Sequence, residues 1–187
     1  MSVLLNIPNS LTLLRIALIP VFVVIFYLPF EWARIVAAVV FVLAAITDAL
    51  DGYLARRLGQ TSRLGAFLDP VADKLMVAVV LVLLVQAHPS IWLALPAAII
   101  IGREITISAL REWMAEVGER QRVGVSSLGK IKTIAQMVSL ILMVYHDELL
   151  GLPMYDIGFV LLYLAAILTI WSMVGYLMAA MPSLQKE

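Results

Sequence analysis

Six stretches of the chain are rich in hydrophobic residues and contain no charged residue. One of them is long enough for the roughly 20 residues that an α-helix needs to cross about 30 Å of hydrocarbon, and the other five are 12 to 15 residues long. Too little polar sequence separates these runs to build a water-soluble exterior. We therefore expect each run to belong to a longer transmembrane helix that continues into charged sequence at one end. The runs are Ile16–Phe30, Ile35–Thr47, Leu75–His88, Ile91–Gly102, Thr133–His146 and Ile157–Gln185.

The predicted fold class is all-α, a polytopic membrane protein built as a six-transmembrane-helix bundle. A short interfacial segment, Met1–Pro8, precedes the first helix, and it lacks the basic start of a signal peptide. No repeat and no long linker divides the sequence, so residues 1–187 are expected to form a single integral membrane domain. The expected spans are 10–29, 33–57, 66–88, 91–116, 128–147 and 155–181.

Charged residues are placed asymmetrically around these spans. The second and fourth uncharged runs meet charged sequence at their C-terminal ends, and the third and fifth meet it at their N-terminal ends. In an antiparallel bundle this alternation puts those ends on one side, and of the 13 Lys and Arg only Arg34 falls on the other side. By the positive-inside rule the crowded side, with both termini, is expected to face the cytoplasm.

The overall composition supports a membrane protein and excludes several other classes. Hydrophobic residues make up 63% of the chain and charged residues 14%, against about 45–50% and about 25% in an ordinary soluble domain. The absence of cysteine excludes a disulfide scaffold, thiol chemistry and a Cys-ligated metal. A formal net charge of zero argues against a nucleic-acid partner.

Four aspartates flank the first charged hairpin. Asp48 and Asp51 lie near the end of the second span, and Asp69 and Asp73 lie near the start of the third. Helical residues three or four apart are about 60° or about 40° from eclipse, so each pair shares a face, and a tight hairpin would turn the two faces toward each other. Four neighbouring carboxylates repel one another unless cations neutralise them, and oxygen ligands favour Mg²⁺ or Mn²⁺.

Small residues and one arginine lie among these aspartates. Gly52, Ala55 and Gly65 leave room for a nucleotide close to the backbone, and Arg56 offers a fixed fork of donors to phosphate. The alternative interpretation is a set of helix-terminal charges at the membrane interface with ordinary small-residue helix packing.

A second group of cations lies in the fourth and fifth spans. Arg103 and Arg111 are separated by about 80° around one helix and about 12 Å along it, so they can flank a cavity. Lys130, Lys132 and Thr133 lie at the cytoplasmic start of the next span. Together these groups suit an anionic acceptor, and a phosphate monoester is the natural candidate.

Simpler explanations remain for these polar residues. The lysines can follow the positive-inside rule, and Arg103 can pair with Glu104 or with a carboxylate of a neighbouring helix. Arg111 can likewise pair with an acidic residue that follows it in the sequence. Three residues of the first span are placed outside the predicted site, because helix capping and interface anchoring also explain them: Asn9, Thr12 and Arg15.

The spacing Asp48-x2-Asp51-Gly52-x2-Ala55-Arg56-x8-Gly65-x3-Asp69-x3-Asp73 resembles the signature of the CDP-alcohol phosphatidyltransferases at every fixed position. The resemblance implies a membrane enzyme that transfers a phosphatidyl group from CDP-diacylglycerol to an alcohol and releases CMP. It further implies two divalent ions, Mg²⁺ or Mn²⁺, held by Asp48, Asp51 and Asp69. Asp73 would share these ions and act as general base, and the cytidine diphosphate would be lined by Gly52, Ala55, Arg56 and Gly65.

Three segments bear on the acceptor: Ile7–Arg15, Arg103–Trp113 and Gly129–Thr133. They resemble bacterial members of this family that use sn-glycerol 3-phosphate, which implies phosphatidylglycerophosphate as product, a homodimer and a location in the bacterial cytoplasmic (inner) membrane. A family member with another acceptor, such as inositol phosphate or serine, is the first alternative. The second is a divalent-cation transporter, although the four aspartates lie at one helix end and transporter sites usually lie near the midplane.

Overall fold

The computed structural model describes residues 7–58, 63–118 and 127–184, without the side chains of some residues in these ranges. All six expected helices are present, and each begins and ends within three residues of its expected bounds. The fold is that of an all-α membrane protein. The helices are α1 (Ile7–Phe26), α2 (Glu31–Leu58), α3 (Arg63–Ala87), α4 (Ile91–Glu116), α5 (Ser127–Tyr145) and α6 (Met154–Leu184).

One small hairpin between α5 and α6 was not expected from the sequence, which predicted only a turn. β1 (Glu148–Leu149) pairs antiparallel with β2 (Leu152–Pro153), and two residues connect the strands. Both connecting residues have positive φ, 55° at Leu150 and 76° at Gly151. Two-residue hairpin turns need this conformation because it matches the twist of the strands, and glycine adopts it without strain.

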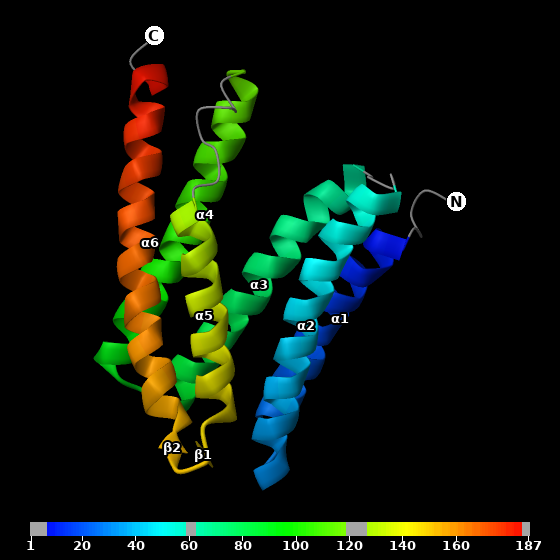
Figure 1. The fold of residues 1–187 in the computed structure, drawn as a ribbon, viewed down its shortest axis with the longest axis vertical. Coiled ribbons are helices and arrows are strands. Elements are labelled where there is room, and N and C mark those ends of the chain that lie inside the picture. The colour runs from blue at the N-terminus through cyan, green and yellow to red at the C-terminus, as the bar shows by residue number, and fades with distance from the viewer. Residues whose placement is uncertain (1–6, 59–62, 119–126, 185–187) are drawn as a thin grey trace.

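The helices form two groups connected by α3 (Figure 1). α4, α5 and α6 stand side by side in one group, α1 and α2 form the other, and α3 runs obliquely between them. α1 packs against both α2 and α3, whereas α2 and α3 make little contact with each other. The aspartates of the two helices nevertheless come close together, because the Thr12 hydroxyl of α1 lies within 3.4 Å of carboxylate oxygens of both Asp51 and Asp69.

The described ends of the chain, the C-terminal ends of α2 and α4 and the N-terminal ends of α3 and α5 lie toward one end of the bundle, and the short turns lie toward the other (Figure 1). Arg34 lies at the end with the short turns, where its guanidinium pairs with Asp147 at 3.0 Å. Between the two ends, the core contains large side chains that are fully buried, such as Phe22, Phe41 and Leu81. The outer surface is apolar instead of polar, as at Val160 and Trp171, which suits contact with lipid.

In the part of the chain that the structure describes, three helices are long and apolar enough to cross a membrane by length and composition, within residues Asn9–Phe26, Ile91–Glu116 and Met154–Met181. α2 and α3 carry the four aspartates of the predicted site.

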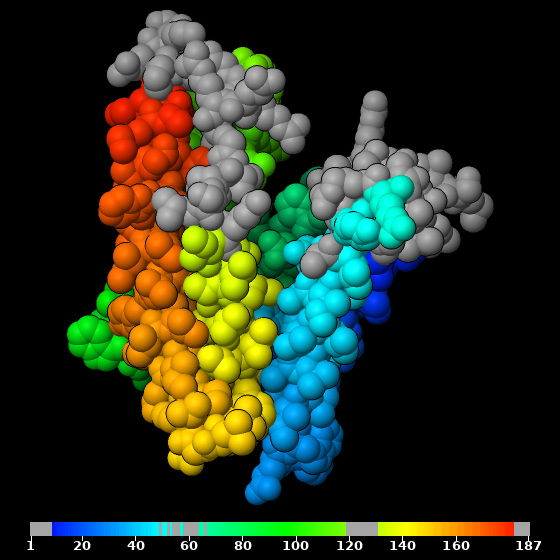
Figure 2. All heavy atoms as spheres, viewed as in Figure 1, coloured from blue at the N-terminus to red at the C-terminus, as the bar shows by residue number. Residues whose placement is uncertain are grey.

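Near the charged end of the bundle the surface is hollowed between α5 and α2, with α3 behind (Figure 2).

The contact between α5 and α6 depends on a glycine. A Cβ atom at Gly158 would lie 2.7 Å from Cγ of Met143 and 2.8 Å from the carbonyl oxygen of Ser139. The Ser139 hydroxyl also donates a hydrogen bond of 2.6 Å to the Gly158 carbonyl oxygen. Close approach of the two backbones therefore requires a residue without a side chain at this position.

Gly158→Ala is expected to lower the stability of the bundle by about 1–3 kcal/mol, because the added methyl group pushes α5 and α6 apart. Thermal unfolding of the purified protein in detergent measures the effect. Gly175→Ala is the matched control on the same helix, since nothing lies within 4 Å of a Cβ at Gly175. Equal unfolding temperatures of the two variants would show that the close contact does not limit stability.

Candidate active site

Three carboxylates from α2 and α3 meet around two side chains of α1. Arg15 pairs with Asp48 at 2.6 Å, measured from Nη1 to Oδ1, and its Nη2 donates to Oδ2 of Asp51. The Thr12 hydroxyl donates to Oδ1 of Asp69 at 2.5 Å and lies 3.4 Å from Oδ2 of Asp51. α1 thus connects aspartates from two helices that barely touch.

Burial makes these polar contacts necessary. Arg15 is 1% exposed and Asp51 is 3% exposed, so both charges are removed from solvent and each needs the other as a partner. Thr12 and Asn9 are also buried, about one and two turns before Arg15 on the same helix. These three residues were predicted to lie outside the site, yet the structure places Thr12 and Arg15 within it. Their spacing of three residues, on an otherwise apolar helix, was the available signal.

The carboxylate cluster has the donor chemistry of a hard divalent-cation site. Asp48, Asp51 and Asp69 supply carboxylate oxygens, and the Thr12 hydroxyl links two of them. Among the residues that the structure describes, no three His, Asp or Glu side chains are arranged as a metal site. The Arg15 guanidinium pairs with Asp48 and Asp51. The residues present fit Mg²⁺ or Mn²⁺ in type.

Asp73 lies one turn beyond Asp69 on α3, between this cluster and a neighbouring cavity. It lines a small pocket together with Arg15 and Asp48. It also lines the larger cavity on the other side, next to Lys74. A carboxylate in this place can interact both with groups bound at the cluster and with a molecule in the cavity.

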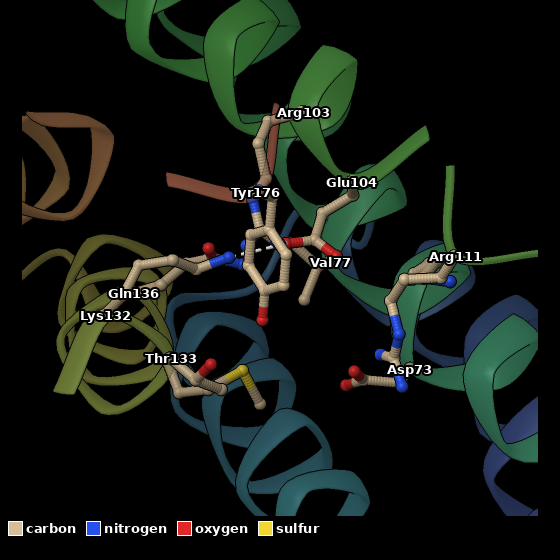
Figure 3. Close-up of a pocket in the computed structure, with 11 residues that line it drawn as sticks. Asp73, Val77, Arg103, Glu104, Arg111, Lys132, Thr133, Gln136 and Tyr176 are labelled. Carbon is tan, nitrogen blue, oxygen red and sulfur yellow. Dashed lines mark hydrogen bonds and ion pairs between the residues drawn. The ribbon is translucent and has the colours of Figure 1, made fainter. Parts of the chain in front are cut away.

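The cavity has a volume of about 170 Å³ and brings together residues of four helices (Figure 3). Four of the five residues predicted to bind an acceptor phosphate lie in its wall: Arg103 and Arg111 of α4, and Lys132 and Thr133 of α5. The side chain of the fifth, Lys130, lies outside the described residues. The remaining lining residues are Asp73, Lys74, Val77, Glu104, Gln136, Met137 and Tyr176.

The guanidinium of Arg103 is contacted by residues of its own helix and of α6. Its Nη1 lies 3.1 Å from Oε1 of Glu104, and its Nη2 donates to the Ser172 hydroxyl at 3.2 Å. Its guanidinium carbon is 5.4 Å from the ring centroid of Tyr176, within cation–π range. The alternative that Arg103 pairs with Glu104 is therefore correct, and Arg103 nevertheless lines the cavity.

Glu104 also binds the second buried cation of the cavity. Nζ of Lys132 lies 2.5 Å from the same Oε1 that contacts Arg103. Sequence reasoning missed the contact of Glu104 with Lys132, and it missed the α6 residues Ser172 and Tyr176. The only sequence signal for Ser172 and Tyr176 was that each is a polar residue within a long apolar run. Such a signal does not indicate which helix packs against that part of α6.

The nucleotide side of the predicted site is described only in part. Gly65 is buried near the start of α3. Three further predicted residues are in the helical backbone of α2, but their side chains lie outside the described residues: Gly52, Ala55 and Arg56.

Comparison with known proteins identifies the family of this chain. Residues 5–171 match the family model described as CDP-alcohol phosphatidyltransferase. A protein of Pectobacterium atrosepticum is 58% identical over 175 residues, which cover 94% of each chain. Relatives from Sodalis glossinidius and Yersinia pestis are 57% and 59% identical, over 94% of this chain and 95% of theirs. All three are named CDP-diacylglycerol–glycerol-3-phosphate 3-phosphatidyltransferase. The chain belongs to the CDP-alcohol phosphatidyltransferase family.

Proposed function

We propose that the protein transfers the phosphatidyl group of CDP-diacylglycerol to sn-glycerol 3-phosphate, with phosphatidylglycerophosphate and CMP as products. The cationic cavity beside Asp73 is the observation that carries this proposal. Its wall holds four basic residues and two acidic ones, which leaves two positive charges for the phosphate dianion of the acceptor. The names of the relatives support the same pair of substrates.

In the proposed reaction, Asp73 takes the proton of the acceptor hydroxyl. That oxygen forms a bond to the β-phosphorus of CDP-diacylglycerol, and the bond from this phosphorus to the oxygen of CMP breaks. Arg103, Arg111 and the Lys130–Thr133 segment hold the acceptor phosphate during the transfer. Asp73 suits this role because it lines both the acceptor cavity and the small pocket beside Arg15 and Asp48.

On the donor side, Asp48, Asp51 and Asp69 would hold two divalent ions, Mg²⁺ or Mn²⁺, and Asp73 would share them. Bound ions of this kind neutralise a pyrophosphate and stabilise entering and leaving oxygens. Gly52, Ala55, Arg56 and Gly65 would line the cytidine diphosphate, as the family motif indicates.

We further infer that the protein is a homodimer in the bacterial cytoplasmic membrane, with its active site and both termini facing the cytoplasm. The positive-inside rule supports this orientation, because the basic residues gather at one end of the bundle. An active site at that end suits the reaction, since one substrate is a membrane lipid and the other is soluble.

A CMP-release assay across a panel of acceptors tests the function. With purified protein and Mg²⁺, release is expected only when both CDP-diacylglycerol and glycerol 3-phosphate are present. Equal release with serine or inositol phosphate would replace the proposed acceptor. Metal uptake into liposomes without CDP-diacylglycerol would instead favour a transporter.

Arg111→Ala is expected to raise the KM for glycerol 3-phosphate by about 10- to 100-fold, because a charge-assisted contact with the phosphate is lost. The KM for CDP-diacylglycerol should change much less. Steady-state kinetics with each substrate varied in turn measure both constants. Arg34→Ala is a control at the opposite end of the bundle. A larger effect on the donor KM would move Arg111 to the nucleotide side.

A further inference from the structure

Glu104 is an acidic residue in a cavity whose other features suit an anion. Its Oε1 lies 3.1 Å from Nη1 of Arg103 and 2.5 Å from Nζ of Lys132. The two side chains Lys132 and Glu104 extend toward each other across the cavity, in front of α3 (Figure 3). Glu104 therefore occupies the anion position between two cations that the acceptor phosphate is proposed to use.

The surroundings make this interaction strong. The side chains of Arg103 and Lys132 are 10% and 4% exposed, and that of Glu104 is 22% exposed. Solvent screens charges poorly at such sites, so the two cations would repel each other in an empty cavity without Glu104. For the same reason, the carboxylate repels a phosphate that enters next to it.

The two cations are not held equally. Arg103 also contacts Ser172 and Tyr176 of α6, which fix its guanidinium whichever anion is present. Among the described residues, Lys132 has an ion pair only with Glu104. Lys132 is thus the cation that can exchange between the carboxylate and a phosphate group.

We propose that Glu104 is an internal counter-ion that competes with phosphate monoesters for Lys132 and Arg103 and so limits their affinity. This inference rests on the proposed function. The product keeps the phosphate monoester of the acceptor, so the same cations that bind the substrate must also release the product. When Glu104 pairs again with Lys132, it replaces the phosphate and speeds that release. Glu104 is accordingly a positioning residue that acts through the two cations.

The test compares Glu104→Gln with Glu112→Gln in the full-length protein. Glu112 lies on the same helix and is exposed, and its side chain makes no hydrogen bond or ion pair with any described residue. Inorganic phosphate is used as a competitive inhibitor against glycerol 3-phosphate in the CMP-release assay. Loss of the Glu104 charge is expected to strengthen phosphate inhibition about tenfold. The KM for glycerol 3-phosphate and kcat should both fall, because substrate and product are each held more tightly. Glu112→Gln should match the wild type.

Other outcomes separate this inference from the alternatives. If Glu104 only supported the fold around the cations, Glu104→Gln would weaken phosphate inhibition and raise the KM for glycerol 3-phosphate. Either of these results overturns the inference. An unchanged phosphate inhibition also overturns it. Glu104→Asp withdraws the carboxylate from Lys132 without removing its charge, so it should strengthen inhibition by a smaller factor. This variant provides the test if Glu104→Gln does not fold. A wild-type protein that neither uses glycerol 3-phosphate nor is inhibited by phosphate would overturn the proposed acceptor as well.

Discussion

Asp73→Asn is expected to lower the rate of CMP release by about 100- to 10,000-fold, the range that a positioned general base contributes. The amide has nearly the same size as the carboxylate but cannot accept the proton of the acceptor hydroxyl. The geometry motivates this variant, because Asp73 is shared by the acceptor cavity and by the small pocket beside Arg15 and Asp48. Binding of CDP-diacylglycerol should persist in part, since three other aspartates are proposed to hold the donor.

Initial rates at saturating concentrations of both substrates measure this effect, and binding of CDP-diacylglycerol is followed separately. Asp156→Asn is the matched control, because Asp156 is exposed in the first turn of α6, at the far end of the bundle. A rate near that of the wild type in Asp73→Asn would exclude a proton-accepting role for this residue. Equal loss of donor binding and turnover would instead assign Asp73 to the donor side alone.

The helices were predictable because each is marked by an uncharged run and each joint by charge, Gly or Pro. The packing of those helices was harder to predict. The positions of Asp48 and Asp51 show that they share a face of α2, but a helical period does not say which helix covers that face. In the structure Arg15 of α1 contacts both aspartates, and this contact with a third helix was not predicted from the sequence.

The cationic cavity beside Asp73 was predictable in its basic residues but not in the contacts that hold them. The spacing of Arg103 and Arg111 on one helix, and the place of Lys132 at the start of the next span, marked them as candidate ligands. The contacts that hold them depend on tertiary structure. Glu104 contacts Lys132 from another helix, and Ser172 and Tyr176 contact Arg103 from a helix distant in sequence. No single sequence pattern encodes such pairs, which is why residues of α6 were absent from the predicted site.

Arg15→Gln is expected to destabilise the protein by about 3 kcal/mol in buffer without divalent metal, because removing one partner of a buried ion pair leaves the other charge uncompensated. Most of this loss of stability is expected to come from Asp51, because Asp51 is 3% exposed, whereas the Asp48 side chain is 45% exposed. If these carboxylates bind Mg²⁺, added Mg²⁺ should raise the unfolding temperature of Arg15→Gln more than that of the wild type. The ion can then supply the positive charge that the guanidinium supplied.

Thermal unfolding in detergent, with EDTA or with Mg²⁺, measures both parts of this prediction. Arg34→Gln is the matched control, because the Arg34–Asp147 pair is exposed on both sides and such pairs contribute about 0–1 kcal/mol. A similar small loss of stability in Arg15→Gln and Arg34→Gln would mean that the buried cluster tolerates its unpaired carboxylates, for instance by binding a proton. A large loss in Arg15→Gln that Mg²⁺ does not reverse would argue against a divalent-cation site at Asp48 and Asp51. A large loss that Mg²⁺ reverses would assign these aspartates to the metal without any measurement of turnover.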